Sequence, residues 1–328
     1  MKRLIALFST LCLLTLSPTL AKKLNVVTSF SILNDITETI GGERIQSKAI
    51  IGANQNAHTY EPTPYDFIDL KKADLFIING LHFEGWLTRT VDASGFNGVL
   101  LDVSTAITPL SADPDHHHDH DDHDHTDHHD DHDGHAAHDH ENHNHDHAHH
   151  DHEHGEFDPH IWQSPLNVIK MAEAIKHELI TLDPEGKAHY EANFEDYQKE
   201  LLALDKWTRD SLKAKSNRAP HFLILHNSFQ YFEHEYGVHF HTLMNSHFAG
   251  EPSAGDLAET MTLIKKNNIT TLFFENIEAS RLLKNLMEDL KLKNGGILYS
   301  DALTKDDTAN SYIKLFRRNV ETMLNSID

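Results

Sequence analysis

The stretch from residue 23 to residue 51, "KLNVVTSFSILNDITETIGGERIQSKAII", decides the fold of the chain. An apolar run at its start predicts a strand, and helical spacing of apolar residues follows until two glycines close the pattern. The last eight residues predict a second strand. A strand, a helix and a strand on short connections form a unit whose strands run in the same direction. The stretch therefore predicts a parallel sheet covered by helices.

The same alternation continues over most of the 328 residues. Apolar runs predict further strands at 74–80, 98–105, 221–226, 238–244, 270–276 and 297–301. Helical periodicity is present at 63–73, 84–95, 164–184, 185–215, 228–237, 251–268, 279–296 and 310–327. We expect an α/β protein with two lobes, each a mostly parallel sheet flanked by helices, joined by one long helix. The predicted limits are 1–21 for a signal peptide, 22–185 for the first lobe, 186–215 for the linking helix and 216–328 for the second lobe.

The start of the chain, "MKRLIALFSTLCLLTLSPTLAKK", predicts a signal peptide that ends at Ala21. Two basic residues precede an apolar run that is too short to span a bilayer. Leu11 stands before Cys12, where a lipid-anchored precursor would carry a small residue, so we expect no lipid anchor. Cys12 is the only cysteine and leaves with the signal. Any metal in the mature chain must then be held by nitrogen and oxygen.

The charge balance argues against a nucleic-acid partner. The chain has 51 acidic and 28 basic residues, and the excess of acid persists outside the histidine-rich tract described next. A protein of this charge is not expected to present a basic face.

A tract from His116 to His154 contains 19 histidines and 13 acidic residues among 39 positions. With three alanines as its only apolar residues it cannot build a core, so we expect a disordered loop over 113–156. Imidazole and carboxylate groups are ligands for first-row transition metals, but a site of fixed geometry needs a rigid scaffold. The tract is therefore predicted to be an accessory metal-capturing segment. Its candidate ligands are His116, His117, His118, His120, His123, His125, His128, His129, His132, His135, His138, His140, His143, His145, His147, His149, His150, His152 and His154.

Four side chains near the ends of predicted strands are better placed for a fixed metal site. In α/β proteins, ligands bind beyond the carboxyl ends of the strands. His58 follows the second predicted strand, His160 follows the tract, and His226 and Asp301 end strands of the second lobe. Three imidazoles and one carboxylate form a tetrahedral set that suits zinc. Glu275, at another strand end, is an alternative to Asp301 or a group that orients a ligating imidazole.

At these residues the chain resembles a known family. The resemblance is carried by "NAHTYEPTPYDFIDLKKADLFIINGLHFEGWL", "FDPHIWQSPLNV", "LILHNSFQYFEHEYGV" and "EPSAGDLAETMTLIKKNNITTLFFEN". Together these segments look like the zinc-binding, ZnuA-like solute-binding proteins of bacterial ABC metal importers. The resemblance implies two α/β lobes bridged by a backbone helix, with the metal in the cleft between them.

The family's ligands then fall on His58, His160 and His226, with Asp301 at the fourth position. The resemblance also implies zinc, because manganese-binding relatives tend to carry a carboxylate where His226 stands. An acidic, histidine-rich loop is a further mark of the zinc branch.

The implied function is high-affinity capture of zinc in the periplasm and delivery to an inner-membrane ABC permease, with zinc as the transported ligand. The permease, its ATPase and a periplasmic zinc chaperone are the expected partners, and we expect a monomer without enzymatic activity. Two alternatives stay open. A secreted zinc-dependent hydrolase could use three histidines with an open fourth position, although the sequence has no H-E-x-x-H motif. A histidine-rich metal storage or buffering protein would need only the tract.

Overall fold

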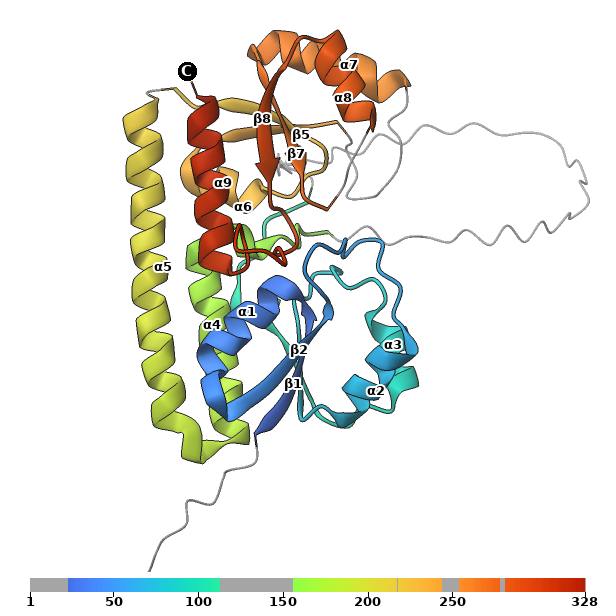
Figure 1. The fold of residues 1–328 in the computed structure, drawn as a ribbon, viewed down its shortest axis with the longest axis vertical. Helices are drawn as coiled ribbons and strands as arrows, with labels where there is room; N and C mark the ends of the chain where they lie inside the picture. Colours follow the sequence, from blue (N-terminus) through green and yellow to red (C-terminus); the bar gives the residue numbers. More distant parts are fainter. Residues whose placement is uncertain (1–22, 113–155, 217, 244–253, 278–280, 328) are drawn as a thin grey trace, which may run out of the picture.

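The computed structural model describes residues 23–112, 156–216, 218–243, 254–277 and 281–327, and these form two parallel sheets of four strands each (Figure 1). The predicted signal peptide and the histidine-rich tract from His116 to His154 lie outside the described residues. The two sheets lie one above the other in Figure 1, with helices packed around them.

The first sheet has the strand order β2-β1-β3-β4. Its strands are β1 (Leu24–Phe30), β2 (Ile45–Ile51), β3 (Leu75–Ile78) and β4 (Val99–Asp102). The associated helices are α1 (Ser31–Gly41), α2 (Pro64–Lys72), α3 (Leu87–Ser94) and the short 3-10 helices η1 (Gly42–Arg44) and η2 (Val103–Ala106). All four residues of β3 are buried, as expected for a central strand covered on both faces.

The second sheet repeats this order as β6-β5-β7-β8. Its strands are β5 (His221–Ile224), β6 (His239–Thr242), β7 (Thr271–Glu275) and β8 (Lys293–Leu298). The associated helices are α6 (Gln230–Tyr236), α7 (Ala254–Asn267), α8 (Arg281–Asp289) and α9 (Tyr312–Ser326). The predicted fold class is confirmed by these two sheets and the helix that joins them.

The two lobes are connected by α5 (Lys187–Lys215), which follows α4 (Pro165–Leu182) and runs beside α9 along one edge of the molecule (Figure 1). Two short 3-10 helices, η3 (Ile161–Gln163) and η4 (Pro184–Gly186), precede α4 and α5. The main hydrophobic core runs from the first sheet through α4, α5 and α9 to the second sheet. Because one packed core crosses both lobes, the lobes are held together by more than their linker. The predicted domain limits stay predictions.

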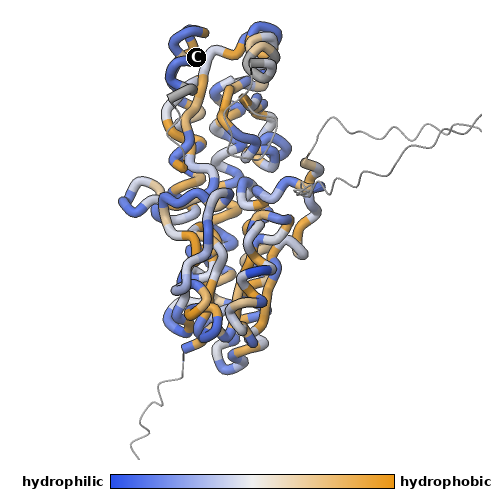
Figure 2. The backbone as a smooth tube through the Cα atoms, turned by 90° about the vertical axis from the view of Figure 1, so that its right-hand side faces the viewer, coloured by the Kyte–Doolittle hydropathy of each residue, from blue (hydrophilic) through white to orange (hydrophobic). Residues whose placement is uncertain are grey.

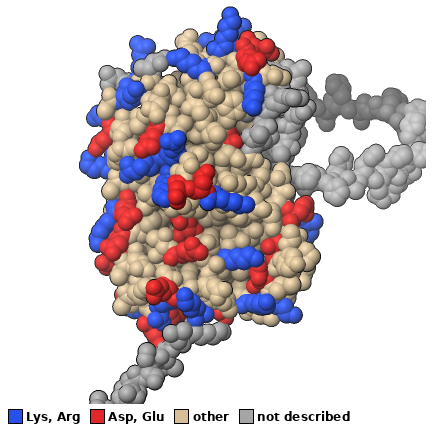
Figure 3. Space-filling view, viewed as in Figure 1, with Lys and Arg blue, Asp and Glu red and all other residues tan. Residues whose placement is uncertain are grey.

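Apolar segments follow the strands inside each lobe, whereas polar segments lie toward the periphery (Figure 2). On the face shown in Figure 3, acidic and basic side chains are interspersed. Among the described helices, none has the length and apolar character needed to cross a membrane.

The last strand differs from its prediction. The sequence predicts a helix up to residue 296 and a strand over 297–301, but β8 already begins at Lys293. Its first residues are largely exposed and include two glycines, so the apolar run that marks a strand is missing there. The pairing of β7 with β8 skips Gly295, and a Cβ on this residue would collide with the ring of Phe273 on β7, which explains why a glycine stands at the irregularity.

Candidate metal centre

Four side chains converge between the two sheets: His58, His160, His226 and Asp301, here called the interlobe cluster. One ligand atom from each lies within 4.8 Å of all the others. In the part of the chain that the structure describes, no other group of three or more His, Cys, Asp or Glu side chains meets this condition. The structure thus brings together all four residues that the sequence singled out.

Each member lies just beyond the carboxyl end of a strand or beside a short helix. His58 lies on the loop between β2 and α2, where its backbone N–H donates to Asn56 Oδ1 at 2.9 Å. His226 follows β5 and Asp301 follows β8, whereas His160 directly precedes η3. Loops at this edge of a parallel sheet are held by the strands behind them, so the side chains have defined positions.

The imidazole of His160 is oriented by Asp158. Its Nδ1 lies 2.6 Å from Asp158 Oδ1, and its backbone N–H donates to the same oxygen at 2.9 Å. Because a carboxylate only accepts hydrogen bonds, Nδ1 donates to Asp158, and Nε2 is the nitrogen that faces the cluster. That Nε2 lies 3.6 Å from Asp301 Oδ1 inside the cluster.

Glu275 has the same relation to His226. Its Oε2 lies 2.8 Å from His226 Nδ1, and the backbone N–H of His226 donates to Oε1 at 3.3 Å. The Nε2 of His226 therefore faces the cluster, 3.3 Å from Asp301 Oδ2. The sequence left Glu275 open between two roles, and the geometry places it behind His226, where it orients the imidazole.

The electrostatics of the cluster are those of a buried ion pair. Burial raises the pKa of Asp301, but the three facing imidazoles, His226 foremost, together outweigh burial and hold that pKa well below its usual range. Burial also opposes a charge on His226, yet Glu275 and Asp301 hold its pKa well above the usual value. A cation bound among these side chains would likewise face the carboxylate of Asp301.

The arrangement of donors and acceptors fits a metal ion. The side chain of Asp301 is fully buried, and neither of its oxygens makes a hydrogen bond of good geometry with a described residue. Nε2 of His58 is 3.2 Å from Asp301 Oδ2 and is likewise buried without such a bond. Buried polar atoms without partners are costly, and a shared cation would satisfy several of them at once.

An aromatic wall surrounds the imidazoles of the first lobe. The Phe83 ring meets His58 edge-on with 5.4 Å between centroids, and Trp162 meets His160 at 5.3 Å. Phe83 and Trp162 also contact each other at 5.0 Å. This wall limits the access of water on one side of the cluster. In the sequence, nothing separates Phe83 from an ordinary core residue.

Hydrogen bonds between the lobes fix the position of Asp301. Trp162 Nε1 and Gln163 Nε2 both donate to the carbonyl of Ser300, at 2.8 and 3.0 Å. Two residues after Asp301, the backbone N–H of Leu303 donates to Ser31 Oγ at 3.1 Å. The loop that carries Asp301 is therefore held on both sides by the first lobe.

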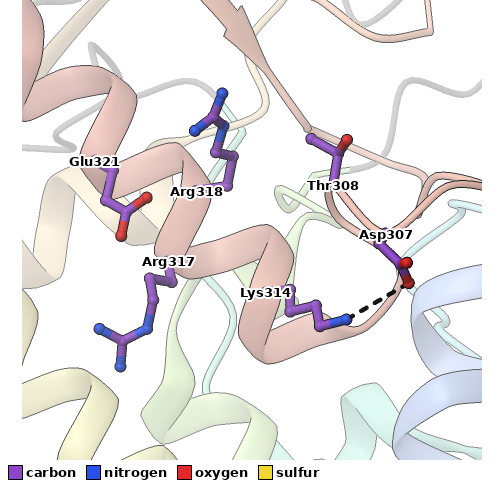
Figure 4. A pocket seen from close by; sticks show the side chains of 6 residues that line it. All are labelled: Asp307, Thr308, Lys314, Arg317, Arg318 and Glu321. Carbon is purple, nitrogen blue, oxygen red and sulfur yellow. Dashed lines mark ion pairs between the residues drawn. The ribbon is translucent and has the colours of Figure 1, made fainter.

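Other groups lie apart from the cluster. His221 Nδ1 and His241 Nε2 are 3.0 Å apart on neighbouring strands, and His239 Nδ1 contacts Glu233 at 2.8 Å. These side chains are only partly buried. A surface pocket beside α9 is lined by charged side chains, among them an ion pair of Lys314 with an aspartate (Figure 4).

A family model described as the zinc-uptake complex component A, periplasmic, matches residues 26–326. The chain belongs to this family, ZnuA. Members are metal-binding, substrate-binding components of ABC transporters, and this chain is one of them. The membership predicted from sequence is thereby confirmed.

Similar proteins differ in the metal that they are named for. The chain is 29% identical over 309 residues to the manganese-binding lipoprotein MntA of Halalkalibacterium halodurans, covering 93% of this chain and 88% of the relative. It is 28% identical over 308 residues to the high-affinity zinc uptake system protein ZnuA of Bacillus subtilis, with 93% and 88% covered. The solved structure of the periplasmic zinc-binding protein TroA from Treponema pallidum has a TM-score of 0.75 at 22% identity, covering 93% and 99%, and thus shares the fold.

Proposed function

We propose that this ZnuA family member captures zinc with high affinity and delivers it to an inner-membrane ABC permease. The observation that carries the proposal is the interlobe cluster, which directs three imidazole nitrogens and one carboxylate at a common point. Asp158 and Glu275 lie against the Nδ1 atoms of His160 and His226, which supports Nε2 of each ring as the atom that binds the ion.

Zinc is favoured over manganese by the donor set. Borderline ions such as zinc accept imidazole readily, whereas manganese prefers carboxylate and other oxygen ligands. Here three of the four candidate ligands are imidazoles, and Asp301 supplies the only carboxylate. The relative named for manganese leaves this choice to experiment.

A transport site is favoured over a catalytic one. A catalytic zinc keeps one position open for water or substrate, whereas His58, His160, His226 and Asp301 can fill all four positions of a tetrahedral ion. We therefore propose no enzymatic activity. The relatives MntA and ZnuA are named for manganese binding and for zinc uptake, not for a reaction, which supports the same conclusion.

The proposed setting is the periplasm, reached through the predicted signal peptide at 1–21. The permease and its ATPase are the proposed partners, with a periplasmic zinc chaperone as a further one, and the protein is proposed to act as a monomer. Several relatives, MntA among them, are named lipoproteins, whereas Leu11 before Cys12 supports our proposal of a chain without a lipid anchor. The tract from His116 to His154 is proposed to collect ions at modest affinity beside the tight site.

The test is a zinc titration of the full chain against a chelator strong enough to strip the weak sites. Tryptophan fluorescence reports the cluster, because Trp162 contacts His160 and the tract contains no tryptophan. Ala at His58, His160 or His226 should each weaken tight binding by well over tenfold. Ala at the exposed His177 is the control and should change nothing. Weakening of less than about tenfold for two of the three variants would reject the ligand assignment.

Metal choice is tested in the same assay. Zinc should be retained against a large excess of manganese in the wild-type chain. Tighter binding of manganese than of zinc would overturn the proposed substrate while leaving the metal site in place.

A further inference from the structure

Glu84 is a buried carboxylate that contacts no member of the interlobe cluster. It is 5% exposed and lies just before α3. Its Oε1 accepts the backbone N–H of Asn79 at 2.7 Å, and its Oε2 accepts that of Gly80 at 3.2 Å. Burial raises its pKa to about 7, although the Ser29 hydroxyl and these backbone N–H groups favour the charged form. Burying a carboxylate is energetically unfavourable, so a buried Glu84 away from the metal ligands calls for an explanation.

The N–H of Gly80 belongs to a strained turn, Gly80–Phe83, and the N–H of Asn79 directly precedes it. Leu81 and His82 have φ values of 53° and 61°, and the N–H of Phe83 donates to the carbonyl of Gly80 at 3.1 Å. Positive φ at both central residues defines a type I′ turn, which normally contains Asn or Gly. Leu and His in these positions cost on the order of 1 kcal/mol each. The turn persists because contacts around it fix its ends, and the Glu84 carboxylate closes it from one side.

One path leads from this turn to the aromatic wall. Phe83 is the last residue of the turn, and its ring contacts His58 and, at 6.3 Å between centroids, His160. If the turn relaxed, the ring would move away from both imidazoles.

A second path leads to the backbone of His160. The side-chain amide of Asn79 donates to the carbonyl of Pro159 at 2.8 Å, and this carbonyl belongs to the peptide group that joins Pro159 to His160. The orientation of Asn79 depends in turn on its backbone N–H, which Glu84 holds. Both paths start at one carboxylate and end at two different imidazoles of the cluster.

We propose that Glu84 is a positioning residue of the metal site, which holds His58 and His160 in their binding geometry by closing the Gly80–Phe83 turn. The inference rests on the proposed function, because it presumes that these imidazoles bind the ion. It goes beyond that function because Glu84 does not contact the ligands itself but acts on them through Phe83 and Asn79.

The charge and shape of the carboxylate are both required. An amide in its place can accept only one of the two N–H groups and turns a donor toward the other. Glu84→Gln therefore keeps the volume of the side chain but loses one of the two hydrogen bonds to the backbone, whereas Glu84→Ala loses both. Residues that hold metal ligands in place typically contribute 10- to 100-fold to metal affinity. We therefore expect Glu84→Gln to weaken zinc binding by about tenfold and Glu84→Ala to weaken it by more.

The control must lose a comparable interaction elsewhere. Asp183 is paired with Arg44 through two bonds of 2.6 and 2.7 Å and accepts from Tyr190 at the turn between α4 and α5. Asp183→Asn should lower the stability of the fold without touching the cluster.

The experiment measures zinc affinity and zinc release in full-length wild type, Glu84→Gln, Glu84→Ala and Asp183→Asn. Release is followed by tryptophan fluorescence after mixing with excess chelator, and the stability of the metal-free chains is followed by urea unfolding. We expect both Glu84 variants to bind zinc more weakly and to release it faster than the wild type. Asp183→Asn should bind zinc as the wild type does, even if it is as unstable as the Glu84 variants. Wild-type affinity in Glu84→Gln, or equal weakening in Asp183→Asn, would overturn the positioning role.

His226→Ala separates the two proposals. Tight zinc in the wild type and its loss in His226→Ala would support the metal site whatever Glu84 does, and normal binding by both Glu84 variants would then reject only the present inference. A wild-type chain without tight zinc would overturn the proposed function, and the positioning role with it.

Discussion

Replacing Glu275 with Gln should weaken zinc binding while making it less dependent on pH. In the wild type, the carboxylate accepts both the Nδ1 proton of His226 and its backbone N–H. An amide has one oxygen for these two donors. If its NH₂ group faces Nδ1, the imidazole must carry its proton on Nε2, which blocks the metal. If its oxygen faces Nδ1, two donors oppose each other at the backbone.

The magnitude follows from the bonds that are lost. A hydrogen bond to a charged group contributes about 1.5–3 kcal/mol and a neutral one about 0.5–1.5 kcal/mol, so the loss of charge alone amounts to about 1 kcal/mol. The mismatched donor adds a cost of similar size. Together they correspond to a 10- to 100-fold weaker affinity at pH 8, the range known for such outer groups.

The pH dependence should change in a defined direction. Glu275 and Asp301 hold the pKa of His226 well above its usual value against the effect of burial. Below that pKa, zinc must displace a proton, so its affinity falls as pH falls. Without the charge of Glu275 the pKa of His226 drops, and proton competition begins at a lower pH. The difference between wild type and variant should therefore be largest near pH 8 and shrink toward pH 6.

The assay is competitive zinc titration of both full-length chains at several pH values. Glu233→Gln is the matched control, because Glu233 makes a similar 2.8 Å contact with Nδ1 of His239 at the surface, away from the cluster. It should bind zinc as the wild type does. Unchanged affinity of Glu275→Gln at pH 8, or a difference that stays constant with pH, would refute the reasoning.

Three further results are expected. Deletion of residues 115–154 should keep one tight zinc per chain and reduce the total number of ions bound, whereas loss of the tight ion in equilibrium dialysis would show that the tract supplies a ligand. Trp162→Phe removes a bond to the Ser300 carbonyl and buried ring volume, and should lower the free energy of unfolding in urea by about 2 kcal/mol. His82→Gly relieves a positive φ at an exposed residue and should raise that free energy by about 0.5 kcal/mol, so a lower urea midpoint would contradict the assigned strain.

The fold and the cluster could be predicted because their signals are local. Buried strands such as β3 and β7 are short apolar runs, and the polar residue after each run marks the edge where ligands bind. His226 shows this well, since it stands two residues after Ile224, the last residue of β5. The start of β8 gave no such signal, because its exposed residues need not be apolar.

The supporting groups could not be predicted because their roles depend on distances between segments far apart in the chain. Asp158 stands two residues before His160, so the sequence already places the two residues near each other. The hydrogen bond between Asp158 and Nδ1 of His160, however, depends on the rotamers of both side chains. Glu275 and His226 are 49 residues apart and meet only through the pairing of β5 with β7. The turn at Leu81 and His82 contradicts the usual turn residues, so the sequence indicates no such conformation there.

The division of the interlobe cluster between the two lobes has a consequence for how an ion would leave. Half of the interlobe cluster, His58 and His160, comes from the chain before α5, and the other half comes from the chain after it. Bonds from zinc to these atoms are only about 2 Å long, so a separation of the halves by about 1 Å would break two of them together. An ion left with two protein ligands exchanges with water far more readily than one with four. Release could then be driven by pulling the halves apart, with no need for a proton or an electron at the site.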